Sequence, residues 1–151
     1  MYVTDTYLIR KVTAAGVVTT LAGSADGVSR LNSEGSVDTT FNPSSDDLGE
    51  VLAMEVQADG KIILALSKSG TFPVARLNND GTLDSTFDTG TGADQAINAI
   101  ALHPDGKILA AGGFNSFSGI ARFGMVRLNT DGAVDGSFLN KVNVPAYNGS
   151  G

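Results

Sequence analysis

One twelve-residue phrase occurs three times in the chain, and this repetition constrains the fold more than any other feature of the sequence. It reads RLNSEGSVDTTF from Arg30, RLNNDGTLDSTF from Arg76 and RLNTDGAVDGSF from Arg127. A second phrase, VQADGKIILAL from Val56, returns as LHPDGKILAAG from Leu102. Copies of the first phrase start 46 and 51 residues apart, and copies of the second start 46 apart. A period of this length indicates an array of equivalent structural units.

Each unit is predicted to contain two β-hairpins. ADGK and PDGK place Asp-Gly between apolar runs, where Gly60 and Gly106 supply the positive φ that a two-residue hairpin turn requires. NSEG, NNDG and NTDG predict a slightly longer turn in the second hairpin. Segments such as KIILAL and AINAIAL are apolar without strict alternation, which is typical of strands covered on both faces. The pattern predicts an all-β protein of propeller-like blades, each a four-stranded antiparallel sheet.

Composition supports this fold and narrows the range of partners. A hydrophobic content of 42% permits a packed core, and 19 glycines with 4 prolines suit many tight turns. A net charge of -6 without a Lys/Arg run argues against binding to nucleic acid or to an anionic membrane surface. The sequence has no long apolar stretch and no signal-peptide pattern at its start, so membrane insertion is not predicted. With no cysteine, neither disulfides nor a thiolate metal site is expected.

Two family resemblances follow from these phrases. The region from Val28 to Phe138, with RLNNDGTLDSTF, LHPDGKILAAG and GGFNSFSG, resembles the delta-60 repeat of large bacterial surface or secreted proteins. That family resembles β-propellers, and its molecular activity is generally unassigned. The opening YVTDTYLIRKVTAAGVVTTLAG is similar to the NHL repeat, another propeller blade, although it lacks the Asn-His pair that precedes the arginine there. The resemblance implies an extracellular or cell-surface location, with a virion as the alternative.

The resemblance and the repeat spacing together predict an incomplete ring. Arg10 and Arg30 would begin equivalent hairpins only 20 positions apart, so the inner hairpin between them is expected to be missing. About three blades cannot close a ring, which typically needs four to eight. We therefore expect open blade edges to associate, with copies of the same chain or with another propeller-containing protein. The predicted order is an NHL-like partial blade (1–27), an outer hairpin and loop (28–49), two delta-60 blades (50–95 and 96–140) and a tail (141–151).

Charged residues recur at equivalent positions of the phrase, and we interpret them as structural. Three equivalent aspartates cannot all line one active site. We expect each arginine to lie beside the aspartate of its own unit across the hairpin. These repeat positions are Arg30, Arg76, Arg127, Asp38, Asp84 and Asp135.

Few other residues are candidates for ligand binding, metal binding or catalysis. Phe114 and Phe117 are the aromatic candidates for contact with a ligand, although packing beneath their glycine-rich loop is favoured. The acidic segments 44–50 and 88–94 carry oxygen ligands suited to Ca²⁺, but solvated loops between blades are favoured. His103 is the only histidine and is expected on a surface turn. With no catalytic motif in the sequence, no catalytic residue, cofactor or metal site is predicted.

Four functional hypotheses remain from the sequence. The leading one is a non-enzymatic propeller module that acts as a scaffold or binding surface for a carbohydrate or a surface protein. The others are a component of a phage tail or fibre, and a truncated or engineered fragment that oligomerises. The fourth is a propeller glycoside hydrolase or lyase, whose carboxylates would come from Glu50, Glu55 and Asp94.

Overall fold

The computed structural model describes residues 8–14, 17–24, 27–32, 34–43 and 48–138, with side chains described from Val28 onward. All elements in these residues are β-strands, which confirms the all-β prediction. They are β1 (Leu8–Ala14), β2 (Val17–Ser24), β3 (Gly27–Leu31), β4 (Glu50–Val56), β5 (Ile62–Ser67), β6 (Val74–Leu77), β7 (Ile97–Leu102), β8 (Ile108–Gly112), β9 (Ser116–Phe117), β10 (Ile120–Ala121) and β11 (Met125–Leu128). None of the described residues forms a helix that could cross a membrane.

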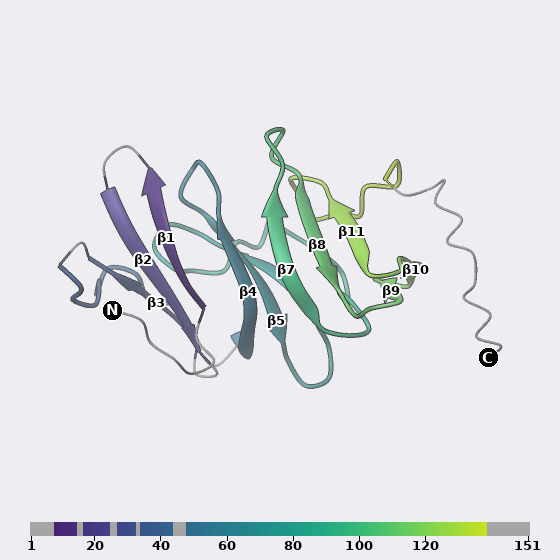
Figure 1. Ribbon diagram of the computed structural model, residues 1–151, viewed down its shortest axis with the longest axis horizontal. Helices are drawn as coiled ribbons and strands as arrows, with labels where there is room; N and C mark the ends of the chain where they lie inside the picture. Colours follow the sequence, from purple (N-terminus) through teal and green to yellow (C-terminus); the bar gives the residue numbers. More distant parts are fainter. Residues whose placement is uncertain (1–7, 15–16, 25–26, 33, 44–47, 139–151) are drawn as a thin grey trace, which may run out of the picture.

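Three antiparallel sheets follow one another along the long axis of the molecule (Figure 1). The first blade has the strand order β1-β2-β3, the second β4-β5-β6 and the third β7-β8-β11. Strands β9 and β10 form a separate two-stranded ribbon beside the third blade. Strand β4 lies against the first blade, and β7 lies against the second. The blades therefore form an open row, as the incomplete ring predicted from the sequence requires.

Each sheet has three strands where the sequence predicted four. In the outer hairpin of each blade the fourth strand is reduced to one isolated bridge: Leu31 with Val37, Leu77 with Leu83, and Leu128 with Val134. The aspartate that follows each bridge accepts a hydrogen bond from the amide two residues ahead. This local bond bends the chain into a turn, which ends the strand.

The first blade is complete, contrary to the prediction that its inner hairpin is missing. Strands β1 and β2 pair over seven residues, from Leu8 with Gly23 to Ala14 with Val17. Arg10 was taken as the equivalent of Arg30, but it lies on β1, the strand that corresponds to β4 and β7. Arg30 lies on β3, opposite Leu21 of β2. The short spacing between the two arginines is thus the spacing of two different strands in one sheet.

The inner turns differ from the two-residue turns expected from Asp-Gly. In the turn from Gln57 to Lys61, the Gln57 amide donates to the Lys61 carbonyl and the Gly60 amide donates to the Gln57 carbonyl. Only Gly60 is left-handed, with φ of +86°, while the Asp59 carboxylate accepts from the Lys61 amide. Aspartate is therefore used for its side-chain hydrogen bond, and glycine for its backbone. The turn from His103 to Lys107 repeats each of these bonds.

The hydrophobic core lies between the blades. Strand β5 has both faces buried, which confirms the prediction made from KIILAL. Ile62, Leu64 and Leu66 pack toward the first blade, in a cluster with Val28, Phe41, Leu48, Val51, Met54 and Leu77. Ile63 and Ala65 pack toward the third blade, in a cluster with Ala53, Val74, Phe87, Ala93, Ile97, Ile100, Ile108, Ala110, Phe114, Phe117, Val126 and Leu128. Each blade thus depends on its neighbour for burial of a face.

Candidate functional site

The repeated phrase forms the same ion pair in all three blades. The Nε atom of the arginine donates to Oδ2 of the aspartate eight residues later, at 2.8 Å in the first two blades and 2.9 Å in the third. The aspartate amide also donates to the arginine carbonyl, so backbone and side chains pair at the same place. These bonds confirm the prediction that each arginine lies beside the aspartate of its own unit.

The phenylalanine that ends each phrase covers this ion pair. The guanidinium carbon lies 4.8 Å from the ring centroid of Phe41, 4.7 Å from that of Phe87 and 4.6 Å from that of Phe138. A guanidinium over an aromatic face is attracted by the ring quadrupole. The residue at the second position after aspartate, Thr40, Thr86 or Ser137, adds a hydroxyl bond to Oδ1. The phrase is therefore one local unit of arginine, aspartate, hydroxyl and aromatic ring.

The arginine also joins its blade to the following one, a role that sequence reasoning missed. Arg30 Nη1 donates to the Asn79 carbonyl at 2.7 Å, and Arg76 Nη1 donates to the Thr130 carbonyl at 2.7 Å. Both carbonyls lie in the outer turn of the next blade. Beside them, the amides of Asn42 and Asp88 donate to carbonyls in the same two turns.

Close approach between the blades explains the glycine of the outer turn. A Cβ atom on Gly81 would lie 2.8 Å from the Pro43 nitrogen, and one on Gly132 would lie 2.7 Å from the Asp88 carbonyl oxygen. Both glycines are also left-handed, with φ of +91° and +95°. A side chain there would separate the blades, so the turn glycine serves both the hairpin and the joint.

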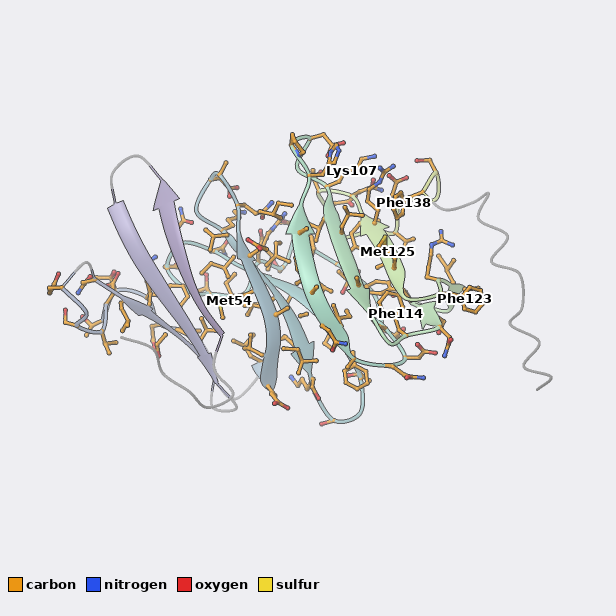
Figure 2. All side chains as sticks on the ribbon, viewed as in Figure 1. Met54, Lys107, Phe114, Phe123, Met125 and Phe138 are labelled. Atoms are coloured by element: carbon orange, nitrogen blue, oxygen red, sulfur yellow. The ribbon has the colours of Figure 1, made fainter. Side chains whose placement is uncertain are left out.

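A lysine from the inner turn completes the site in the second and third blades. Lys61 Nζ lies 2.7 Å from Asp84 Oδ2, and Lys107 Nζ lies 2.8 Å from Asp135 Oδ2. Figure 2 shows Lys107 and Phe138 at the same end of the third blade. The lysine, followed by the neighbouring hydroxyl, holds the pKa of Asp84 and of Asp135 well below its ordinary value of 3.8. These carboxylates are therefore charged structural acceptors at neutral pH and cannot serve as proton donors.

Asp38 shows the same effect in the first blade through hydrogen bonds. The hydroxyl and then the amide of Thr40, with a smaller contribution from Arg30, lower the pKa of Asp38 from 3.8 to about 2. Because the folded-state pKa is depressed, the carboxylate stabilises the fold above pH 3.8 and loses this effect as pH falls toward 2.

Thr40→Val is expected to raise the pKa of Asp38 toward 3.8, because it removes the largest contribution to the shift. A carboxyl-carbon NMR titration measures this directly, and urea unfolding between pH 2 and pH 5 should show stability lost at higher pH than in the unmodified chain. Thr39→Val is the matched control, since Thr39 is exposed and next in sequence. A pKa that stays near 2 in Thr40→Val would contradict the assignment of the shift to Thr40.

Phe114 and Phe117 lie in the core. Both rings are almost fully buried and meet edge to face, with centroids 6.3 Å apart and planes at 65°. They pack against Ile97 and Val126 in the cluster between the second and third blades. In this conformation neither ring offers a face to a ligand.

The only histidine borders a hollow of about 280 Å³ between the inner turns of the second and third blades. His103 is exposed, and its Nδ1 lies 2.7 Å from Asp105 Oδ1. Gln57, on the facing turn, has a buried Oε1 atom that accepts no hydrogen bond from the described residues. The lining consists of Gln57, Ala58, Leu102, His103, Pro104 and Gly106.

Of the acidic segments considered for calcium, residues 44–47 lie outside the described residues, and the described acidic residues do not gather. Asp88 accepts from the Gly90 amide, and Asp94 accepts from the Asn115 and Ser116 amides. Among the described residues no three metal-binding side chains lie together. Glu50 and Glu55 stand at opposite ends of β4, roughly 16 Å apart along the strand at ~3.3 Å per residue. A glycosidase pair needs about 5 to 10 Å.

The structure consists of repeated antiparallel blades that pack face to face in a row. One recurring ion-pair unit joins them, and this arrangement defines a β-propeller repeat protein. The chain matches the domain-of-unknown-function family DUF5122, described as a beta-propeller, over residues 5–41, 57–87 and 103–138. These ranges cover more than half of the 151 residues, and the chain belongs to this family. No curated protein matches the chain.

Proposed function

We propose that the chain is a non-enzymatic β-propeller module that serves as a structural and binding scaffold in an extracellular or cell-surface assembly. The observation that carries this proposal is the use of its recurring charged residues. Arg76, for example, contacts Asp84, Phe87 and the Thr130 carbonyl at once, and thereby joins two hairpins and two blades. Arg76 is also buried, and a buried group committed to such a joint supports the architecture of the protein.

The finer family assignment is part of the same proposal. We assign the second and third blades to the delta-60 type and the first to an NHL-like variant. The second and third blades share the Asp-Gly inner turn and the lysine that reaches the aspartate, at equivalent positions. In the first blade the connection from Ala14 to Val17 is shorter, and its sequence contains no Asp-Gly pair followed by lysine.

The hollow between the inner turns is the surface we propose for ligand contact. Loops positioned by rigid sheets commonly carry binding. The unpartnered Gln57 Oε1 suits a hydroxyl donor, and Pro104 and Leu102 offer an apolar floor. A polysaccharide presents both hydroxyl groups and apolar ring faces, so it is the ligand class that we propose.

Co-sedimentation with insoluble cellulose, chitin and peptidoglycan, combined with an assay for released reducing ends, tests the proposal. We expect the chain to sediment with at least one polysaccharide and to release no reducing ends. Gln57→Ala with His103→Ala should reduce the bound fraction several-fold, whereas Gln95→Ala, an exposed glutamine elsewhere, should leave it unchanged. Release of reducing ends would establish a glycoside hydrolase or lyase instead.

A further inference from the structure

The third blade exposes a face whose counterpart in the second blade is buried. We define the outer face of the third blade as Ala99, Leu109, Ala111, Phe123, Met125 and Arg127. In the second blade the equivalent residues, Ala53, Ile63, Ala65, Phe72, Val74 and Arg76, pack against the third blade. The strand registers support the equivalence, since Ala53 pairs with Ala65 as Ala99 pairs with Ala111.

Exposure at the equivalent positions differs sharply. Val74 is 3% exposed, whereas Met125 is 40% exposed. Phe72 is partly buried against the core between the blades, whereas Phe123 is 66% exposed. Figure 2 shows Phe123 and Met125 at the end of the row that is distant from β1. Large apolar side chains gathered on one face mark an interaction surface.

Within the described residues, the arginine of the third blade lacks the acceptor that the other two arginines have. Arg30 and Arg76 each donate through Nη1 to the outer turn of the next blade. In the part of the chain that the structure describes, the side-chain hydrogen bonds of Arg127 go to Asp135 alone. Its Nη1 group is thus placed for a turn carbonyl of a following blade.

The first blade offers the complementary feature. Its outer turn contains Gly35, which is left-handed with φ of +89°, like Gly81 and Gly132. A Cβ atom on Gly81 or Gly132 would meet the backbone of the preceding blade, but one on Gly35 would have nothing within 4 Å. This turn is therefore shaped for a joint with a preceding blade.

We propose that a second copy of this chain docks on the outer face of the third blade through its own first blade. The contact repeats the joint already made twice within the chain, which is the reason for choosing a second copy over an unrelated partner. Arg127 would donate to the outer turn that holds Gly35, and Phe123 and Met125 would become buried. Two copies joined head to tail at both ends give six blades, within the range of closed propellers.

Light scattering on a sizing column, over a dilution series, tests this proposal. We expect a mass twice the 15.5 kDa of one chain. Phe123→Asp with Met125→Asp should weaken association by about 100-fold, because charges would be buried in the joint. Leu83→Asp, at a site 57% exposed on another surface, is the matched control and should remain dimeric.

Gly35→Asn tests the other side of the joint without touching the apolar face. Asparagine tolerates the left-handed backbone, and a Cβ atom on Gly35 meets nothing within 4 Å beyond its own chain neighbours. We expect this variant to be monomeric, and its circular dichroism spectrum to be unchanged. An equimolar mixture with the Phe123→Asp, Met125→Asp chain should recover dimers, since one of the two joints is then intact.

Several results would overturn the proposal. They are a single-chain mass at all concentrations, an open polymer, a dimer that survives both variants, and a mixture that stays monomeric. A single-chain mass would mean that another segment of the polypeptide or another protein covers the outer face. The polysaccharide assay does not depend on this result, so the scaffold proposal and the dimer proposal fail separately.

Discussion

Phe117→Ala is expected to lower the free energy of unfolding by about 3–5 kcal/mol, the usual cost of removing a buried aromatic ring from a core. Phe117 is fully buried and lies edge to face with Phe114 between the second and third blades. Its backbone also bridges to Ala93 of the loop before β7. The cavity would therefore weaken both the third blade and its joint with the second. Urea unfolding followed by circular dichroism measures the loss.

The control for this experiment is Leu83→Ala, because Leu83 is apolar but largely exposed. We expect its effect to stay within about 0.5 kcal/mol, as for most surface substitutions. A Phe117→Ala variant as stable as the unmodified chain would show that the ring does not support the core. Such a result would return Phe117 to the ligand-contacting role considered from the sequence.

Gly112→Ala is expected to destabilise the chain by about 3 kcal/mol or more, since overpacking against backbone leaves no side chain free to move. A Cβ atom on Gly112 would lie 2.0 Å from the Ala96 carbonyl oxygen and 2.8 Å from the Ile97 Cα. Gly112 pairs with Ile97 across β7 and β8, next to a register shift at Asn98. Relief of the clash would therefore require the two strands to separate.

The neighbouring glycine provides a matched control. A Cβ atom on Gly113 would have its nearest contact at 3.7 Å, with the flexible Gln95 side chain. Gly113→Ala should be neutral or slightly stabilising, because alanine restricts the unfolded chain. Thermal unfolding of both variants gives the comparison. Equal melting temperatures would show that β7 and β8 are not held as closely as the structure indicates.

Local features were predicted well from the sequence. The hairpins, the all-β class, the strand covered on both faces and the Arg–Asp pairs all depend on residues within about ten positions of one another. Arg76 and Asp84, for example, are brought together by the turn between them, whatever the rest of the chain does. The two errors in the fold, four strands per sheet and a missing hairpin in the first blade, have specific causes. Four strands were predicted because the turn that the aspartate forms after each bridge was overlooked. The hairpin was thought missing because Arg10 and Arg30, which belong to different strands, were treated as equivalent.

The chemical roles of the site residues were only half predicted. Sequence reasoning paired Asp84 with Arg76 but not with Lys61, although both the lysine and the aspartate recur one blade later as Lys107 and Asp135. That recurrence is the signal that could have revealed the contact. The role of the terminal phenylalanine as a cover for the guanidinium had a comparable signal in its fixed spacing from the arginine.

The sequence by itself determined the repeating unit of this protein: its hairpins, its turn glycines and the ion pair inside each phrase. These are contacts between residues close in the sequence, and their periodic spacing allows them to be predicted. The tertiary structure alone decided how the units meet. Arg76 reaches Thr130 across 54 residues, and Phe123 is exposed where Phe72 is partly buried, because blade packing sets both. Residues at equivalent positions of the repeat therefore have different environments, according to whether another blade lies beside them.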